Sequence, residues 1–299
     1  MLLEDVLAEM SQQGKCSGDT SFELLALVGT NLGKRTLTFI DSFKYVSEIS
    51  ENFVVLTSPK FAHKVSTDNI CITKEPRLLY FKIHNYLAEK CGYRRNRTET
   101  KIGNSCNINS LSSIAKDNVI IGNNVTIEEF VSIKEGTVIG NNCLIGAGSV
   151  IGGKGLAFQK TGDFVLPISH IGGVILGNNV EVQQQCVVEN AIYPWDNTEI
   201  NEGSKIGNLC VIGHAVRISK RVLIAGNSLV GGRTTIGNDA WIGPSTTITN
   251  GISIGDSAKV NIGAVVVEDV ADRKSVTGNF AVENILFLRN QIKQFKRLS

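Results

Sequence analysis

The stretch INEGSKIGNLCVIGHAVRI, residues 200–218, places an isoleucine at every sixth position. An α-helix repeats about every 3.6 residues and a two-sided strand about every two, so neither explains this period. A strict six-residue repeat is typical of a solenoid of very short strands, whose units bury their apolar sides only by stacking. One slot, after Val188, is held by Pro194. The phase otherwise includes Ile102, Ile108, Ile114, every sixth residue from Ile121 to Ile151, then Leu176, Val182, Val188 and every sixth residue from Ile200 to Val260.

Glycine often follows the repeating residue, and asparagine pairs such as Asn123-Asn124 and Asn141-Asn142 stand between repeats. Both residue types tolerate the left-handed backbone conformation that tight corners need. The pattern resembles the left-handed parallel β-helix of the hexapeptide-repeat acyltransferases over roughly residues 101–280. This resemblance implies a mainly β protein with three hexads in each triangular coil, and a homotrimer with active sites between subunits. The alternative is an antiparallel sandwich with many turns.

Composition narrows the class of protein. The net charge of the 299 residues is +2, which gives no sign of nucleic-acid binding. We find no signal segment and no apolar run of the roughly 20 residues that would span a bilayer. The seven cysteines form no CxxC pair, so neither a metal site nor a disulfide framework is expected. We therefore expect a soluble, cytoplasmic protein.

The sequence divides into three parts. Residues 1–98 lack the hexad and predict a small α/β domain, with a helix opening at Pro76. Residues 99–280 form the repeat, which an excursion over 152–175 interrupts, and such an excursion usually lies on the binding face. Residues 281–299 predict an amphipathic helix, which is expected either to stabilise the trimer or to offer a basic surface to an acyl carrier protein. Its apolar face holds Ile285, Leu288, Ile292 and Phe295, and its basic residues are Arg289, Lys293, Lys296 and Arg297.

Four histidines are candidates for the general base that acyl transfer needs near neutral pH. They are His63, His84, His170 and His214. His214 lies in the repeat, two residues after the inward-facing Ile212, so it is near a corner and away from the core. A zinc enzyme of the carbonic-anhydrase kind would need several histidine ligands, and the repeat holds only one. We therefore predict no metal site and take His214 as the base.

Three further stretches resemble the UDP-3-O-acyl-glucosamine N-acyltransferases, a lipid A family. Residues 37–45 (LTFIDSFKY) fit the uridine-binding segment of that family. The stretch from GKGLAF, residues 153–158, through Pro167 to Glu181 fits its substrate loop. Residues 208–216 (NLCVIGHAV) fit the segment around its catalytic histidine.

The resemblance implies that an acyl group, often 3-hydroxyacyl, moves from a thioester to the amine of a UDP-linked amino sugar. The donor would be an acyl carrier protein or acyl-CoA, with no bound cofactor. Phe39, Ser42 and Tyr45 would bind the nucleotide, although Phe39 and Tyr45 could equally be core residues. Further substrate contacts would come from Phe158, His170 and Asn208.

Several residues depart from the family pattern. The uracil segment has Ser42 in place of asparagine, so dTDP remains an alternative to UDP as the nucleotide that this segment binds. Ala215 follows the histidine where the family has asparagine. The stretch from Val260 to Ala281 resembles the ending of sugar acetyltransferases instead. The alternative function is therefore acetyl-CoA-dependent acetylation of another nucleotide-linked amino sugar for surface polysaccharide.

Two neighbours of His214 follow from a coil length of eighteen residues. Gly232 lies one coil later, and its backbone N–H is a candidate donor to the oxyanion. Asp196 lies eighteen residues earlier and would orient the imidazole if no loop intervened. Pro194 and Trp195 in the core slot argue for a bulge there, which would displace Asp196.

Overall fold

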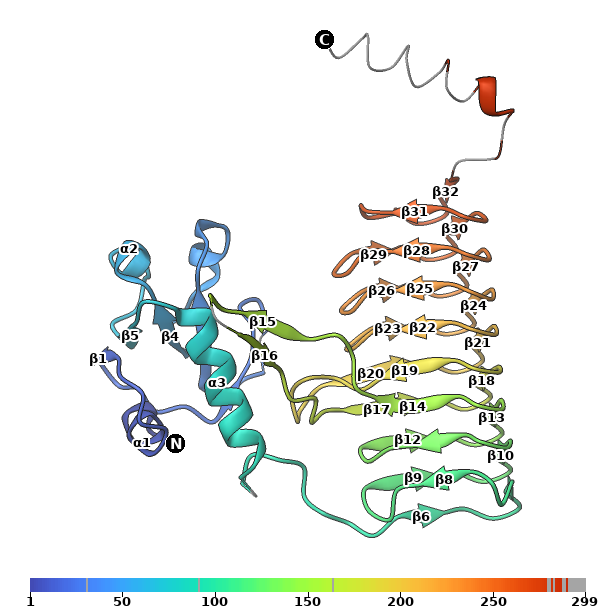
Figure 1. The fold of residues 1–299 in the computed structure, drawn as a ribbon, viewed down its shortest axis with the longest axis horizontal. Coiled ribbons are helices and arrows are strands. Elements are labelled where there is room, and N and C mark those ends of the chain that lie inside the picture. Colours follow the sequence, from blue (N-terminus) through green and yellow to red (C-terminus); the bar gives the residue numbers. More distant parts are fainter. Residues whose placement is uncertain are drawn as a thin grey trace.

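The computed structural model describes residues 1–30, 32–90, 92–162, 164–278, 281, 283–286 and 289. From residue 101 onward the chain winds through three parallel sheets in strict rotation, which confirms the predicted β-helix (Figure 1). The inward residues of the hexads form one continuous column, in which Ile200, Ile206 and Ile212 are fully buried. Stacking of these side chains is the main source of stability, since no single coil has a core of its own.

The strands of the repeat are two to four residues long. The first sheet contains β6 (Lys101–Ile102), β9 (Val119–Ile121), β12 (Thr137–Ile139), β17 (Gly173–Leu176), β20 (Asn197–Ile200), β23 (Arg217–Ile218), β26 (Thr235–Ile236) and β29 (Ser253–Ile254). The second contains β7 (Asn107–Ile108), β10 (Thr126–Ile127), β13 (Leu144–Ile145), β18 (Glu181–Val182), β21 (Lys205–Ile206), β24 (Leu223–Ile224), β27 (Trp241–Ile242), β30 (Lys259–Val260) and β32 (Ser275–Val276). The third contains β8 (Ser113–Ile114), β11 (Ser132–Ile133), β14 (Val150–Gly153), β19 (Val187–Glu189), β22 (Val211–Ile212), β25 (Leu229–Val230), β28 (Thr247–Ile248) and β31 (Val265–Val266).

Two insertions leave the repeat at the same corner, between the third and first sheets. The longer one leaves after β14 and returns at β17, so the interruption is shorter than the predicted 152–175. It carries the antiparallel hairpin of β15 (Phe158–Lys160) and β16 (Val165–Pro167). The second insertion lies between β19 and β20 on the next coil, and it contains Pro194. The prediction that Pro194 holds a core slot is wrong, because Val188 and Ile200 are consecutive members of the column.

The N-terminal domain is a five-stranded sheet flanked by helices. Its strand order is β1 (Lys15–Ser17), β5 (Ile70–Ile72), β4 (Phe53–Thr57), β3 (Thr36–Ile40) and β2 (Leu24–Leu25), and only the β1–β5 pair is antiparallel. The helices are α1 (Leu3–Glu9), a 3₁₀ helix at Phe43–Glu48, α2 (Pro59–Ala62) and α3 (Pro76–Ala88). The predicted helix at Pro76 is therefore present as α3, which packs on β3 and β4.

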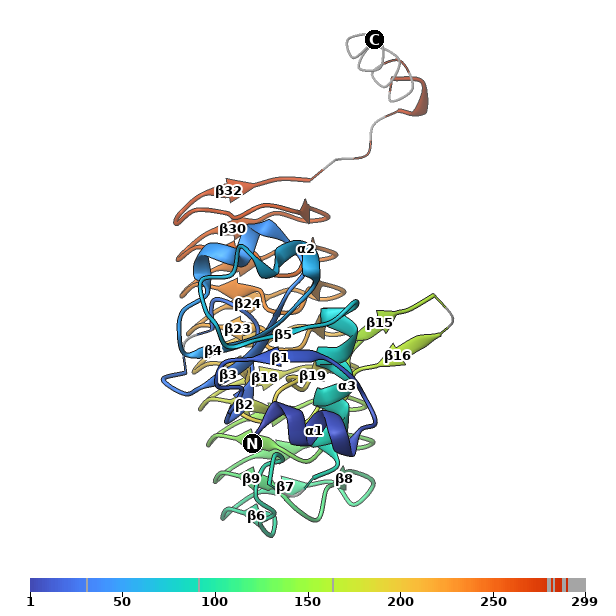
Figure 2. The same ribbon diagram turned by 90° about the vertical axis from the view of Figure 1, so that its left-hand side faces the viewer.

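The insertions hold the N-terminal domain beside the middle coils of the β-helix (Figures 1 and 2). From the second insertion, the Trp195 indole donates to Leu25 O at 2.8 Å, and the hydroxyls of Tyr80 and Tyr193 share a buried hydrogen bond of 2.9 Å. From the first insertion, Ser169 O accepts from His84 Nε2 at 2.8 Å and Pro167 O accepts from Asn85 Nδ2 at 2.7 Å. The corner that carries the insertions is therefore the corner that the domain covers.

Of the predicted C-terminal helix, only residues 284–286 and 289 are described as helical. Ile285 and Arg289 are exposed. Leu288, Ile292, Lys293, Phe295, Lys296 and Arg297 lie outside the described residues. No helix within the described ranges is long and apolar enough to cross a membrane.

The buried tyrosine pair generates a stability prediction. Tyr193→Phe leaves the Tyr80 hydroxyl buried without its partner, so the free energy of unfolding should fall by about 1–3 kcal/mol. Tyr80→Phe combined with Tyr193→Phe removes both hydroxyls and should recover part of that loss. Denaturant titrations of the single and double variants give the coupling energy. Additive losses would show that the hydrogen bond does not couple the domain to the β-helix.

Candidate active site

His214 lies at the corner between the third and first sheets, on the coil that follows the second insertion. Strand register stacks Val188, Ile212 and Val230 in the core, so the residues two positions later form a column at the corner. That column runs from Asn190 through His214 to Gly232. The side chain of His214 is half-buried and away from the aliphatic core, as its position in the hexad predicts.

The backbone of His214 is fixed on both sides. Its N–H donates to Glu189 Oε2 at 3.0 Å, and its carbonyl accepts from Arg233 N at 2.8 Å. The next residue, Ala215, adopts the left-handed conformation with φ of 56°, and its N–H donates to Thr198 Oγ1 at 2.8 Å. The imidazole is therefore presented by a tight corner whose amides are bonded to the preceding coil.

Gly232 faces the imidazole directly. A Cβ atom on Gly232 would lie 2.7 Å from His214 Nε2, so any larger residue would require the imidazole to move. The Gly232 N–H has no acceptor among the described residues. A free backbone donor beside a ring nitrogen is the arrangement that a general base and an oxyanion donor require.

His170, from the longer insertion, lies against His214. The ring centroids are 5.9 Å apart with an interplanar angle of 76°. Its Nδ1 lies 3.1 Å from Ile168 O, and because a carbonyl only accepts, Nδ1 carries the hydrogen. Nε2 of His170 and Nδ1 of His214 are both buried without a hydrogen-bond partner among the described residues.

Burial changes the ionisation of these groups. It is the main cause that lowers the pKa of His214 to about 4, and the nearby Arg233 and His170 lower it further. Burial also lowers the pKa of His170 and raises that of Glu189. At neutral pH His214 is therefore an uncharged imidazole, which is the form that can accept a proton.

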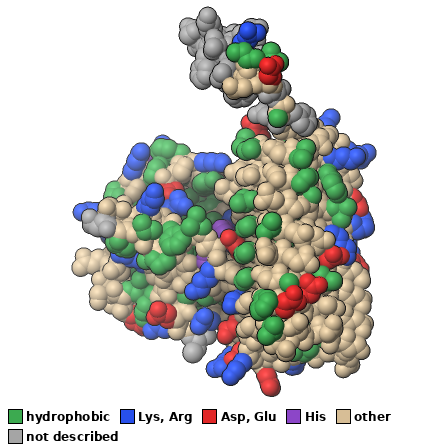
Figure 3. Space-filling view, turned by 45° about the vertical axis from the view of Figure 1, so that its right-hand side comes forward, with side chains coloured by type: hydrophobic (Ala, Val, Ile, Leu, Met, Phe, Trp, Pro, Cys, Tyr) green, Lys and Arg blue, Asp and Glu red, His purple; other side chains and the backbone are tan. Residues whose placement is uncertain are grey.

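A cavity of about 480 Å³ opens along the same corner, on the preceding coils. Its lining includes His170 and Asn190, which link it to the histidine pair. The cationic residues of the lining come from the interdomain linker, from the corner after β11 and from the longer insertion. They are Arg94, Arg95, Lys134 and Lys154, and the lining contains one acidic residue, Glu135. Figure 3 shows histidine side chains at the hollow between the N-terminal domain and the β-helix.

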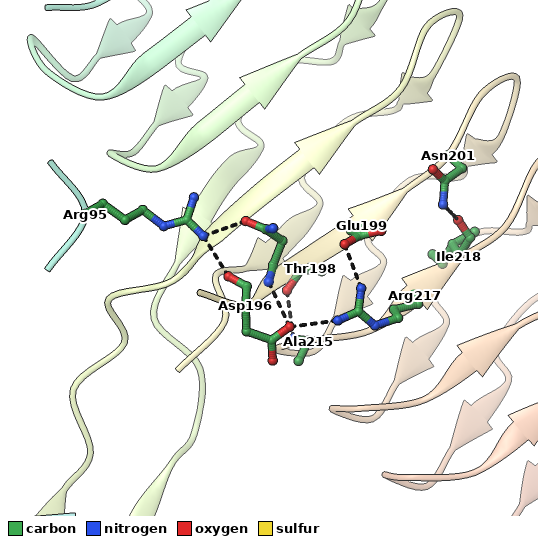
Figure 4. A network of polar contacts seen from close by, with 9 residues as sticks. Arg95, Asp196, Thr198, Glu199, Asn201, Ala215, Arg217 and Ile218 are labelled. Carbon is green, nitrogen blue, oxygen red and sulfur yellow. Dashed lines mark hydrogen bonds and ion pairs between the residues drawn. The ribbon is translucent and has the colours of Figure 1, made fainter. Parts of the chain in front are cut away.

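Asp196 does not lie beside the imidazole. The second insertion makes the coil six residues longer, so Asn190 rather than Asp196 is the neighbour of His214 one coil earlier. The Asp196 carboxylate, only 3% exposed, pairs with Arg217 Nη2 at 2.9 Å. Arg217 also binds Glu199 Oε1 at 2.6 Å (Figure 4). Asp196 therefore fixes the return of the insertion to β20 and does not orient His214.

The two aromatic residues of the predicted nucleotide segment differ in exposure. Phe39 packs against Tyr80 and Phe81 with centroid distances of 5.0 and 6.1 Å, and the Arg77 guanidinium lies 5.8 Å above its ring. Tyr45 is 39% exposed. Ser42 caps the 3₁₀ helix by accepting from Lys44 N at 3.4 Å. Phe39 is thus partly a core residue, whereas the Tyr45 ring is open to a ligand.

The other predicted contacts are not brought to His214. Phe158 lies exposed on β15, in the hairpin. Asn208 lies at a different corner, between β21 and β22, where its Oδ1 accepts from Gln184 N at 3.0 Å. Within the described part of the chain, no group of three or more histidine, cysteine or acidic side chains could hold a metal ion.

Sequence reasoning missed the cationic lining and Asn190. Counting corner positions coil by coil, with both insertions removed, would have placed Asn190 in the column of His214 and Lys134 one residue before that column. Arg94 and Arg95 had no such signal, because they reach the corner only through docking of the domain.

Comparison with known proteins finds similarity to hexapeptide-repeat transferases. The bacterial transferase hexapeptide family (six repeats) matches residues 118–153. UDP-3-O-acylglucosamine N-acyltransferase 1 of Gloeobacter violaceus is 43% identical over 48% of this chain and 40% of its own length. The corresponding protein of Shewanella denitrificans is 36% identical over 50% of this chain and 44% of its own length. The chain thus spans less than half of the length of these curated relatives.

Two solved structures share the fold. A UDP-N-acetylglucosamine acyltransferase of Arabidopsis is 22% identical, with a TM-score of 0.50 over 64% of this chain and 73% of its own. A UDP-N-acetylglucosamine acyltransferase of Bacteroides fragilis is 20% identical, with a TM-score of 0.52 over 67% of this chain and 75% of its own. At these identities the likeness shows the fold alone.

The lowered pKa of His214 predicts a pH dependence. Between about pH 6.5 and 4, the unfolded chain binds a proton at this histidine that the folded protein excludes. The contribution of His214 to the free energy of unfolding should therefore fall as the pH drops through this window and be constant above it. The stability difference between wild type and His214→Gln, measured against pH, isolates this contribution. In NMR spectra the imidazole should titrate near pH 4, and a midpoint near 6.5 would contradict the buried, neutral state.

Proposed function

We propose, from the premise that this chain is a hexapeptide-repeat protein related to the UDP-3-O-acylglucosamine N-acyltransferases, that it acylates the amine of a UDP-linked amino sugar. The observation that carries the proposal is that His214 Nε2 lies 2.7 Å from where a Cβ atom of Gly232 would stand, beside a backbone N–H that has no acceptor among the described residues. The related proteins carry the substrate class in their names.

In the proposed reaction the sugar amine attacks the carbonyl carbon of a thioester. His214 takes a proton from the amine as the carbon–nitrogen bond forms, and the Gly232 N–H donates to the oxyanion. The carbon–sulfur bond then breaks, the proton passes to the leaving thiolate, and an amide and a free thiol result. A buried, uncharged imidazole suits this step because no competing proton occupies it at neutral pH.

The donor and the assembly are also part of the proposal. We infer that the donor is an acyl carrier protein or acyl-CoA, and that the reaction takes place in the cytoplasm. The outward face of the third sheet supports a homotrimer, because Val150, Val187, Val211 and Leu229 form an apolar stripe along it, which Val265 continues beyond Thr247. Figure 3 shows hydrophobic side chains in rows along the β-helix axis. Such stripes mark protein–protein contacts.

His214→Ala should lower turnover at least about a hundredfold, the usual scale for loss of a general base, while the protein stays folded. Gly232→Ala should also inactivate, because its methyl group displaces the imidazole. The assay uses UDP-amino sugars with acyl donors from acetyl-CoA to long-chain 3-hydroxyacyl carrier protein, read by mass spectrometry. His63→Ala is the matched control and should keep full activity. Wild-type turnover in His214→Ala would remove this residue from the mechanism, and exclusive use of acetyl-CoA would favour an acetyltransferase.

The exposed aromatic residue supports nucleotide binding by the N-terminal domain. Tyr45→Ala should weaken binding of UDP by about ten- to a hundredfold, the scale of one lost stacking contact. Phe43→Ala removes a ring from the same 3₁₀ helix and serves as the control. Titration of UDP, dTDP and UMP by calorimetry measures both effects and separates uracil from thymine. Equal affinity of wild type and Tyr45→Ala would exclude a stacking role for this ring.

A further inference from the structure

The corner that holds the cavity has a concentration of unsatisfied polar atoms, and three of the residues that carry them, Arg95, His170 and Asn190, line the cavity itself. Eight buried side-chain nitrogen or oxygen atoms among the described residues lack a hydrogen-bond partner, and five lie at this corner. These five are Arg95 Nε, Thr137 Oγ1, His170 Nε2, Asn190 Oδ1 and His214 Nδ1. Because buried polar groups are nearly always hydrogen-bonded, such a cluster indicates a site that a polar ligand or ordered water completes.

The charge of the lining identifies the first part of the ligand. Arg94, Arg95, Lys134 and Lys154 form no ion pair with any carboxylate among the described residues. Arg95 binds only neutral oxygens, Asp196 O at 2.8 Å and Asn197 Oδ1 at 2.6 Å. Four cations around one cavity, with a single acidic residue, favour an anion of more than one negative charge.

The acceptor atoms identify the second part. Asn190 Nδ2 donates to His170 O at 3.3 Å, which leaves Asn190 Oδ1 free as an acceptor. The hydrogen of His170 is on Nδ1, so its free Nε2 is also an acceptor. Two free acceptors beside the cations match a group that carries hydroxyl or amine donors next to its phosphate.

We propose that this cavity binds the diphosphate of the acceptor substrate through Arg94, Arg95, Lys134 and Lys154, while His170 and Asn190 accept hydrogen bonds from the attached sugar. The proposal rests on the proposed function and specifies how its acceptor is held. A sugar bound there adjoins His214 through His170, so its amine would lie on the same corner as the base.

Inorganic pyrophosphate tests the cationic part without any acyl transfer. In calorimetry, Lys134→Gln combined with Lys154→Gln should weaken pyrophosphate binding at least about tenfold. The control Lys220→Gln removes one positive charge, where the double variant removes two, and does so at another corner, where Lys220 pairs with Glu202 at 3.3 Å; it should bind like wild type. No binding by wild type, or equal weakening in Lys220→Gln, would overturn the proposal.

Competition separates the two possible sources of phosphate. UDP should displace pyrophosphate, and uridine should not. Displacement by coenzyme A but not by UDP would assign the cavity to the acyl donor and overturn the proposal. His170→Phe keeps a ring but removes Nε2, so the preference of wild type for UDP-glucosamine over UDP should shrink. An unchanged preference in this variant would exclude His170 from sugar recognition.

The outcomes are distinguishable from failure of the proposed function. His214→Ala should bind pyrophosphate as wild type does, because the phosphate contacts do not involve His214. Loss of pyrophosphate binding in His214→Ala would place the anion at the base itself and contradict the proposed subsite. Full turnover in His214→Ala would instead show that His214 is not the base. The anion subsite would still be judged by pyrophosphate binding alone.

Discussion

Closure of the coil is the constraint on which the rest of the structure depends. Each coil must place one aliphatic side chain inward from each of three sheets, and these side chains stack without a gap from Val119 to Val270. Because strands pair in parallel with the next coil, a residue added within a strand would turn the inward side chains outward. Additional residues can therefore leave only at a corner. Both insertions do so, and they gather the docking contacts, the histidine pair and the cavity at one edge of the β-helix.

The histidine at this edge shows how local geometry sets chemistry. His214 is held through its backbone by Glu189 and Arg233, and among the described residues its Nδ1 has no hydrogen-bond partner. Burial and neighbouring positive charge keep the ring uncharged. A glycine in the next coil leaves the space that Nε2 occupies. Orientation and protonation are thus determined by different features, namely the corner backbone for the first, and burial with Arg233 and His170 for the second.

The β-helix could be predicted from the sequence because each side of a coil takes six residues and buries one of them. The six-residue spacing of Ile200, Ile206 and Ile212 therefore requires these side chains to face inward. The position of His214 at a corner, away from the core, followed from the same counting. Asp196 did not, because an eighteen-residue offset crosses a six-residue insertion whose register the sequence leaves open. Arg95 reaches the cavity from the linker, and that approach depends on hydrogen bonds such as the one between Trp195 and Leu25. Contacts between the N-terminal domain and the β-helix have no such signal, because the domain does not share the six-residue repeat.

The placement of both insertions at one corner has a consequence for how such a chain can change. Segments of different length and composition can be exchanged there without altering the inward residue of any strand, since Val188 and Ile200 remain consecutive whatever lies between them. The insertions at this corner can therefore vary in sequence and length while the β-helix itself stays unchanged. The contacts that hold the N-terminal domain, part of the cavity lining and the second histidine, His170, can all be replaced through it, while His214 on the following coil keeps its place.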